Sequence, residues 1–195
     1  MERTERTSAL SPLPAGHLSS PRLILRPLRP GDAHSLCGYR ALPEVARYQS
    51  WESYGPDDAA RLINAQQGKE PNVPGTWFQL AIIEKETNTM IGDCGLHCPS
   101  DEPQQMEFGI TLSPAHQGHG YATETLRCLL HHAFTTLDKH RVYAFTDSEN
   151  RPSAALFRRL GFRQEAHHLD HRRFKGRWQS EFVFALLKRE WEAAQ

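Results

Sequence analysis

The stretch Ser113-Pro-Ala-His-Gln-Gly-His-Gly-Tyr-Ala-Thr123 decides the fold of this chain. It follows an alternating, strand-like run at residues 105–112 and precedes a segment, residues 122–137, in which apolar residues recur at helical spacing. Its two glycines allow a tight or left-handed backbone, and the N–H groups that open the next helix direct their positive dipole end at the same place. The stretch therefore predicts a strand, a loop and a helix, with the loop placed to bind a diphosphate.

Two better-known glycine-rich loops do not match this stretch. A P-loop ends in Gly-Lys followed by Ser or Thr, and that ending is absent. The dinucleotide fingerprint needs glycine or alanine where Thr123 stands and an acidic residue about 20 positions later, where this chain has Tyr143. A plain turn without a ligand remains the other interpretation of the loop taken alone.

The pattern on either side predicts a layered α/β/α domain of the α+β class. Strands are expected at residues 22–28, 77–84, 89–97, 105–112, 141–146, 163–168 and 177–187, and helices at 56–67, 122–137 and 151–160. The early strands read as an antiparallel meander, whereas the later alternation of strand and helix needs a right-handed parallel crossover. We therefore expect a mixed, mostly antiparallel sheet of six to seven strands flanked by helices.

Length and charge limit the classes of function. A chain of 195 residues predicts one domain, and 23 basic against 23 acidic residues give no net field toward nucleic acid or an anionic membrane. No apolar run approaches the ~20 residues of a membrane span. Residues 1–20 lack the apolar core of a signal peptide. We expect a flexible leader over residues 1–20, one domain over 21–195 and a cytoplasmic location.

The four cysteines do not predict a metal site. The run Cys94-Gly-Leu-His-Cys98 has the look of half a zinc site, but no second Cys/His pair stands at a matching spacing. A cytosolic chain of this size also needs no disulfides. We expect no metal.

Several motifs in order resemble the GCN5-related N-acetyltransferases, the GNAT family. The stretch Gln117-x-x-Gly120-x-Ala122 is similar to the acetyl-CoA signature of that family, Gln or Arg-x-x-Gly-x-Gly or Ala. The resemblance continues through Asn150-Arg-Pro-Ser153, Leu156-Phe-Arg-Arg-Leu-Gly-Phe162 and Gly176-Arg-Trp178. The runs Arg22-Leu-Ile-Leu-Arg-Pro27, Glu107-Phe-Gly-Ile110 and Gly120-Tyr-Ala-Thr-Glu124 look like the RimJ/RimL-like branch, which acetylates the N-termini of ribosomal proteins. The match covers about residues 21–191, nearly the whole chain.

The resemblance implies a sheet that splays at its centre, between residues 105–112 and 141–146, with acetyl-CoA in the gap. The backbone of Ile110, Thr111 and Leu112 would then hold the pantetheine arm. Asn150 and Ser153 would lie beside the thioester. The pyrophosphate would be bound by the backbone amides of Gln117, Gly118, His119, Gly120, Tyr121, Ala122 and Thr123.

Acetyl transfer needs a neutral amine, a stabilised oxyanion and a departing thiolate. An α-amino group, with a pKa of ~7.7–8.0, is partly neutral at pH 7, so a modest base suffices for it. Glu107 is the candidate base, acting through a water, and the alternative is a plain strand carboxylate. A backbone N–H of the same strand is the candidate oxyanion donor.

The family often uses a tyrosine in the helix after Asn150 as the acid for the thiolate. Here the nearby aromatic residue is Phe157, which cannot donate a proton. Ser153 is the replacement candidate, by a hydrogen bond to the sulfur. The alternative is a first-turn serine that bonds only backbone.

The expected activity is direct transfer from acetyl-CoA to a primary amine in a ternary complex, with a protein N-terminal α-amine as the first expectation. A small amine (an aminoglycoside, a polyamine or an amino acid) stays open, as does a non-catalytic acetyl-CoA-binding module. Carboxylates in the acceptor groove would favour a small cationic amine. We expect a monomer or homodimer that binds neither membrane nor nucleic acid directly. The aromatics of Tyr48-Gln-Ser-Trp51, with Trp77 and Trp178, are candidates for the groove, and the basic run 172–178 is expected at a solvated hairpin tip.

Overall fold

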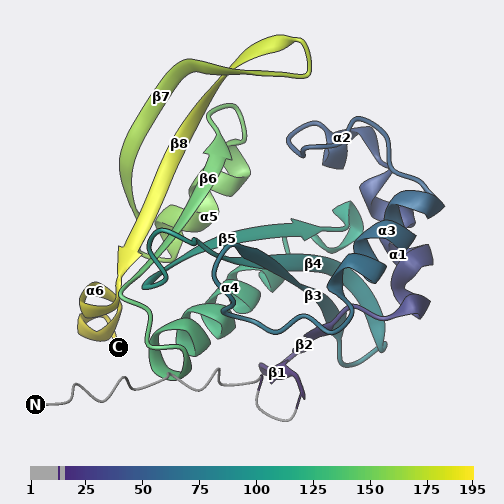
Figure 1. The fold of residues 1–195 in the computed structure, drawn as a ribbon, viewed down its shortest axis with the longest axis horizontal. Coiled ribbons are helices and arrows are strands. Elements are labelled where there is room, and N and C mark those ends of the chain that lie inside the picture. The colour runs from purple at the N-terminus through teal and green to yellow at the C-terminus, as the bar shows by residue number, and fades with distance from the viewer. Residues whose placement is uncertain (1–12, 14–15) are drawn as a thin grey trace, which may run out of the picture.

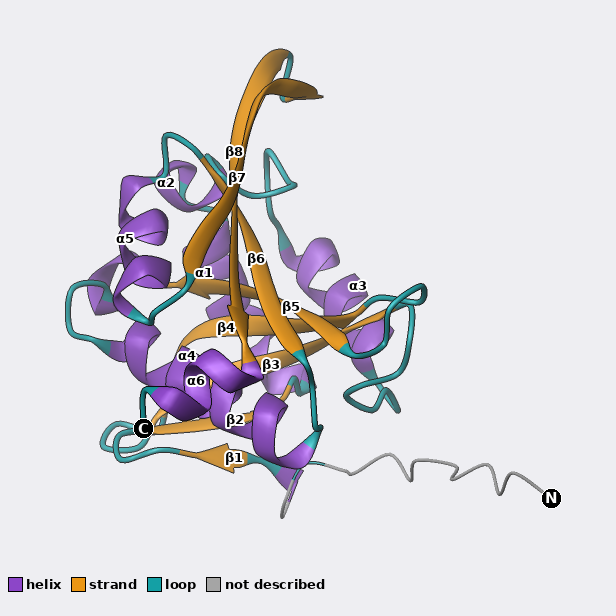
Figure 2. Cartoon of the chain, turned by 90° about the vertical axis from the view of Figure 1, so that its left-hand side faces the viewer, coloured by secondary structure: helices purple, strands orange, loops and turns teal. Residues whose placement is uncertain are grey.

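A mixed sheet with helices on both faces forms the body of the protein (Figures 1 and 2). The computed structural model describes Leu13 and residues 16–195. The strands in these residues are β1 (Leu18–Ser19), β2 (Leu23–Pro27), β3 (Thr76–Glu84), β4 (Thr89–Cys98), β5 (Gln105–Leu112), β6 (Arg141–Asp147), β7 (Arg163–Phe174) and β8 (Arg177–Leu187). The helices are α1 (Ala33–Arg40), α2 (Pro43–Ala46), α3 (Pro56–Gln66), α4 (Tyr121–His131), α5 (Arg151–Arg159) and α6 (Lys188–Ala193).

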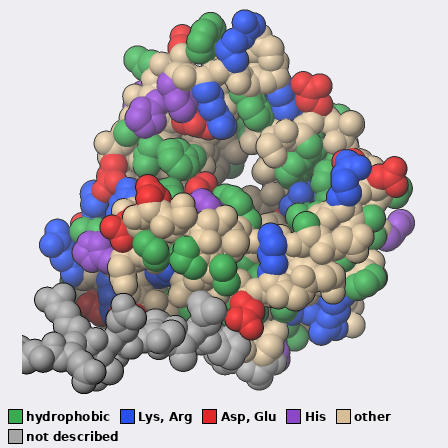
Figure 3. Space-filling model, viewed as in Figure 1, with side chains coloured by type: hydrophobic (Ala, Val, Ile, Leu, Met, Phe, Trp, Pro, Cys, Tyr) green, Lys and Arg blue, Asp and Glu red, His purple; other side chains and the backbone are tan. Residues whose placement is uncertain are grey.

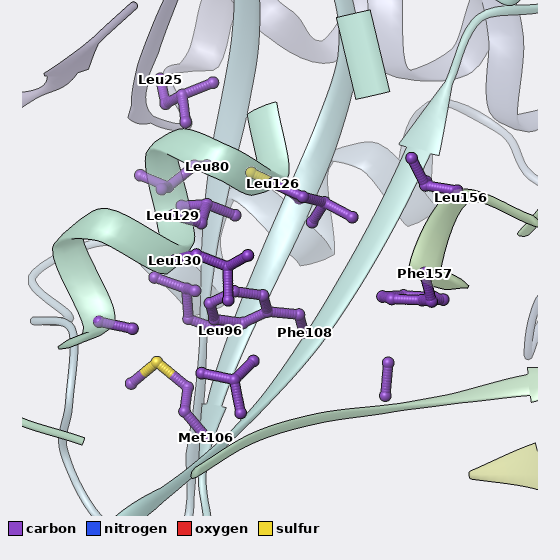
Figure 4. Packing of buried hydrophobic residues seen from close by; sticks show 14 of the residues in the cluster. Leu25, Leu80, Leu96, Met106, Phe108, Leu126, Leu129, Leu130, Leu156 and Phe157 are labelled. Carbon is purple, nitrogen blue, oxygen red and sulfur yellow. The ribbon is translucent and has the colours of Figure 1, made fainter. Parts of the chain in front are cut away.

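Strand β3 explains why helices cover both faces. Its Leu80 and Ile82 are buried against α4, whereas Ala81 and Ile83 are buried against α1 and α3. Successive residues of a strand point to opposite faces, so an uninterrupted apolar run is a strand covered on both sides. Figure 4 shows the leucines of α4 directed at the sheet. Each fully buried leucine contributes roughly 1.5–3 kcal/mol of burial free energy.

The sheet splays between β5 and β6. The two strands run parallel and pair over only three residues, from Gln105↔Arg141 to Glu107↔Tyr143. Beyond Glu107, β5 stays bonded to β4 as far as Leu112, while β6 stays bonded to β8 as far as Asp147. The crossover through α4 supplies the parallel strand, as the sequence predicted. The predicted central splay is confirmed.

The N-terminal boundary differs from the prediction, and so does the strand count. The described residues form eight strands in the order β1-β2-β3-β4-β5-β6-β8-β7, rather than six or seven. The added strand, β1, pairs Leu18 with Leu25 of β2, although it falls in the expected leader. It is anchored because the Ser20 hydroxyl donates to a carboxylate oxygen of Glu124 at 2.7 Å. The rest of the expected leader, residues 1–12 and 14–15, lies outside the described residues.

The C-terminal half is close to the prediction. Helix α5 ends as expected: Gly161 has φ +85°, the Phe162 N–H donates to the Phe157 carbonyl at 3.1 Å, and the two rings are in contact. The predicted helix over residues 122–137 instead changes at His132 into one π-helical turn, His132–Thr136. The sequence analysis missed α6.

Strands β7 and β8 extend past the end of β6 as a projecting hairpin, and residues 169–180 are called the arm below (Figure 1). The prediction ended the first strand of this hairpin at residue 168, but β7 continues to Phe174. The arm turns at Lys175 and Gly176, where a turn was predicted. Both residues have positive φ, +48° and +78°, as type I′ hairpin turns require.

Candidate active site

A cleft of about 430 Å³ opens where β5 and β6 diverge. Its floor is β5 from Glu107 to Ile110, and α5 contributes Ser153 and Phe157. Residues after α2 form one wall and the arm forms another. The remaining lining residues are Tyr48, Gln49, Phe145, Thr146, Asp147, Asn150, His171, Arg172, Gln179 and Glu181. The divergence of β5 and β6 thus opens a cleft at the centre of the sheet, in the gap where the sequence analysis expects acetyl-CoA.

Glu107 faces this cleft and, among the described residues, pairs with no lysine or arginine; its basic neighbour is His97. Burial raises the pKa of Glu107 to about 7, with a further contribution from the negative charge of Glu181. The residue alternates with buried Phe108, so it lies on the less packed face of β5, as predicted. A carboxyl group with a pKa near 7 changes protonation state in the working range of a general base.

A stack of two aromatic rings flanks Glu107. His97 lies opposite Glu107 in the β4–β5 register, and its Nδ1 is 3.6 Å from Glu107 Oε2. The His97 ring stacks on Trp77, with centroids 5.0 Å apart and planes 15° apart. Trp77 in turn lies over Gly95, where an added Cβ would be 2.8 Å from the indole. Glycine is therefore required at that position, and the stack fixes His97 beside the carboxyl group.

The other carboxylates of the cleft carry partners. Glu181 accepts from Arg172 at 2.5 Å and lies 2.7 Å from Nε2 of His171. Asp147 accepts from the amide of Gln179 at 2.8 Å and lies 3.9 Å from the guanidinium of Arg177. Because these charges are compensated by neighbours, Glu107 is the carboxyl group of the cleft left to act on a ligand.

The loop from Gln117 to Thr123 leads into α4 and lies outside the lining of the cleft. Gly118 and Gly120 have φ of +80° and +82°, and Gly120 is the N-cap of the helix. In the described part of the chain, the backbone N–H groups of residues 118–123 donate no hydrogen bond. The N–H of Gln117 does donate, to the Pro114 carbonyl at 3.2 Å, and its side chain donates to the Leu112 carbonyl. Six consecutive free donors at a helix N-terminus are the donor set that a diphosphate needs.

A cluster of ionic contacts holds this loop against β2. The Arg22 guanidinium donates to the carbonyl of His119 at 3.1 Å and to the carboxylate of Glu124 at 2.7 Å. It also lies 4.4 Å above the ring of Tyr121, whose hydroxyl donates to Glu84. Arg22 thereby fixes the loop through one carbonyl, leaving its N–H groups free.

The second half of β5, from Ile110 to Leu112, has one edge that no neighbouring strand pairs with. Ile110, Thr111 and Leu112 pair with β4 on one side and have no β6 partner on the other. Of the three, Ile110 lines the cleft, and Thr111 accepts a hydrogen bond from Gln49 at 3.2 Å. An unpaired strand edge offers backbone donors and acceptors in a row, which suits an extended amide-bearing chain such as pantetheine.

Asn150 and Ser153 lie together at the start of α5, on the cleft wall. The Asn150 side chain caps the helix by accepting from the backbone N–H of Ser153 at 3.2 Å. The cap uses the N–H of Ser153 and not its hydroxyl, and Ser153 lines the same cleft as Glu107. Asn150 thus has a structural role beside any contact with a ligand.

Sequence reasoning missed the neighbours that set the properties of Glu107. His97 and Trp77 come from two other strands, and Glu181 from β8, so strand register had to be known to bring them together. In the sequence, the only hint of this stack was that Gly95 and His97 alternate on one face of the same strand. Within the described residues no group of three or more His, Cys, Asp or Glu side chains is arranged to hold a metal ion. No helix there is long and apolar enough to cross a membrane.

Comparison with known proteins agrees with this geometry. The model of the acetyltransferase (GNAT) domain matches residues 22–163. The chain is 34% identical over 174 residues to an uncharacterized N-acetyltransferase of Bacillus licheniformis, p20, covering 89% of this chain and 97% of that protein. It is 30% identical over 176 residues to a provisionally named ribosomal N-acetyltransferase of Bacillus subtilis, YdaF, covering 87% and 93%.

Among solved structures, spermidine N-acetyltransferase of Vibrio cholerae, in complex with CoA and spermine, superposes with a TM-score of 0.75. The two chains are 24% identical, and the match covers 88% of this chain and 98% of that one. The likeness to that structure is one of fold. The family match and the p20 relative go further: this chain belongs to the GNAT family and is an acetyl-CoA-dependent acyltransferase.

Proposed function

We propose that the chain transfers the acetyl group of acetyl-CoA to a protein N-terminal α-amine by direct attack in a ternary complex in the cleft. The observation that carries this proposal is Glu107, a carboxyl group on the floor of the splay that has a raised pKa and, in the described structure, no lysine or arginine partner. Acetyl-CoA supplies the activated acyl group. The loop Gln117–Thr123 would bind its diphosphate, and the open edge of β5 would hold its pantetheine arm through Ile110, Thr111 and Leu112.

The pKa of Glu107 is close enough to that of an α-amine for a proton to pass between them. An α-amino group has a pKa near 8, close to the value of about 7 for Glu107, so the carboxylate can take its proton, through a water, with little free-energy cost. A lysine side chain, with a pKa near 10.4, would present a harder transfer. As the C–N bond forms and the C–S bond breaks, the Ser153 hydroxyl would donate a hydrogen bond to the departing sulfur. A free N–H of β5 would stabilise the oxyanion.

The pairing of the cleft carboxylates supports a peptide acceptor. An acceptor with several positive charges needs several unpaired carboxylates, but Asp147 lies 3.9 Å from Arg177 and Glu181 is paired with Arg172. A single positively charged amine would therefore balance the negative charge of Glu107. The RimJ/RimL-like motifs of the sequence and the ribosomal name of the YdaF relative point the same way.

A small cationic amine is the second candidate, and a specific observation favours it. Glu107, Asp147 and Glu181 all face the cleft, and a cation that displaced Arg172 would find carboxylates ready to bind it. The Vibrio cholerae structure of the same fold is that of a spermidine N-acetyltransferase. The four free cysteines support a reducing, cytoplasmic setting for either activity.

Thiol release from acetyl-CoA across a panel of N-terminal peptides and small amines tests the proposal. We expect saturable turnover with peptides and a preference for particular first residues. Turnover with polyamines or aminoglycosides alone would replace the first candidate by the second. Coenzyme binding without turnover on any amine would mean that the chain is a binding module.

A further inference from the structure

The arm meets residues 46–51, at the end of α2 and just after it, across the cleft. The ammonium group of Lys175, at the turn of the arm, donates to the Ala46 carbonyl at 2.6 Å and to the Trp51 carbonyl. These partners are 129 and 124 residues away along the chain. Two charge-assisted hydrogen bonds from one ammonium group make this the principal contact at the tip of the arm.

A second, weaker contact joins the same two parts. Glu149 Oε2 lies 3.3 Å from Arg47, just after α2, and 3.3 Å from Arg177, at the start of β8. All three side chains are about half exposed, so these ion pairs add little by themselves. Lys175 therefore makes the stronger of the two contacts between the arm and residues 46–51.

The turn itself argues that Lys175 has a purpose beyond reversing the chain. Lys175 adopts φ +48°, a region that favours Asn, Asp or Gly at the first position of a type I′ turn. An asparagine would make the turn more easily, but its side chain is too short to span to the carbonyls of the opposite segment. The lysine fits the contact better than it fits the turn.

Beneath this contact lie the two walls of the cleft. Tyr48 and Gln49 come from the segment after α2, His171 and Arg172 come from the arm, and Glu107 lies on the floor between them. Figure 3 shows the molecule hollowed between the arm and the body, with the tip of the arm closing the hollow on its outer side. The contacts thus make a ring of chain around the approach to Glu107.

We propose that Lys175 latches the arm to the Ala46–Trp51 segment as a closed arch, and that the acceptor reaches Glu107 by threading beneath it. The arch admits the slender end of an extended peptide and excludes one that carries a bulky side chain just after its first residue. This inference rests on the proposed function, which it narrows to extended chain ends.

Two peptides that share their first residue test the arch, one with glycine and one with biphenylalanine at the second position. We expect wild type to prefer the slender peptide by about tenfold or more in kcat/KM. Lys175→Met keeps the aliphatic stem but removes the ammonium group, and we expect it to raise kcat/KM for the bulky peptide until the preference falls to about twofold. Arg173→Ala is the matched control and should keep the wild-type preference, because this arm cation bonds, among the residues the structure describes, only the Gly176 carbonyl within the turn.

Hydrogen exchange separates failure of the arch from failure of the proposed function. Lys175→Met should speed exchange in residues 46–51 and 169–180, while coenzyme binding stays unchanged. Equal exchange in the variant and wild type, or an unchanged peptide preference, overturns the arch. If neither peptide is acetylated although the exchange result holds, the arch stands and the peptide acceptor is wrong.

Discussion

Replacing Glu107 by glutamine tests the chemistry and the electrostatics of the cleft in one variant. Glutamine keeps the shape of the side chain but neither accepts the proton of an attacking amine nor ionises. Loss of a positioned general base costs about 10²–10⁴-fold in rate. We therefore expect kcat/KM to fall by that factor, while the affinity for CoA, measured by calorimetry, stays within about twofold because Glu107 is not part of the diphosphate loop.

The same variant should change how stability depends on pH. The pKa of Glu107 is about 7 in the folded protein against a usual value of 4.5, so between those values the folded state holds more protons than the unfolded state. Stability of the wild type therefore falls as pH rises through this window. From pH 5 to pH 8 the loss from this one group is about 2.5 kcal/mol, at 1.36 kcal/mol per pKa unit. Glu107→Gln lacks this loss and should gain that much relative to wild type over the window.

Urea unfolding of both proteins at several pH values measures the difference, because every other titrating group cancels between them. Glu192→Gln, on an exposed carboxylate of α6, is the matched control and should follow the wild-type pH dependence. Parallel stability curves for wild type and Glu107→Gln would refute the raised pKa. Full activity in Glu107→Gln would refute the role of Glu107 as base.

Four further variants probe other parts of the protein. Gly118→Ala and Gly120→Ala both place a side chain at positive φ, costing about 1–2 kcal/mol of unfolding free energy each, but only the Cβ at Gly120 comes within 3.4 Å of Arg22. Calorimetry should therefore show the larger loss of CoA affinity for Gly120→Ala, and equal losses would contradict the role of Arg22. Ser153→Ala should lower kcat by roughly tenfold, the loss expected for about one hydrogen bond, with stability unchanged in thermal melts because its N–H, not its hydroxyl, serves the helix cap. Away from the cleft, Asp93 of β4 and Arg40 of α1 form a buried ion pair at 2.5 Å. Asp93→Ala should cost about 3–5 kcal/mol in urea unfolding because it leaves the Arg40 charge buried without this partner, and a cost below about 1 kcal/mol would show that the pair is not buried in solution.

Local patterns in the sequence were enough to predict the framework of the site. The alternation of Glu107 with Phe108 predicts the bounds of β5, and the Gly118-x-Gly120 loop before an apolar stripe predicts the start of α4. Asn150 was likewise predicted at the helix start that it caps. These features depend on residues within a few positions of one another, which is why sequence alone reaches them.

Features that depend on distant pairs were not predictable. The raised pKa of Glu107 comes from its burial in the folded cleft and from the charge of Glu181, and its position beside His97 needs the β4–β5 register. The contact of Lys175 with Ala46 spans 129 residues, so a hairpin tip that the sequence suggests is solvated is instead docked. Two-residue β1 is too short to show a period and is stabilised by Glu124, a residue of α4.

Hydrogen exchange with and without CoA tests most directly whether the splay and the following loop hold the coenzyme. The account predicts slowed exchange at residues 118–123, whose N–H groups are free in the described structure, and at residues 110–112 on the open edge of β5. Unchanged exchange in both segments at saturating CoA would contradict it.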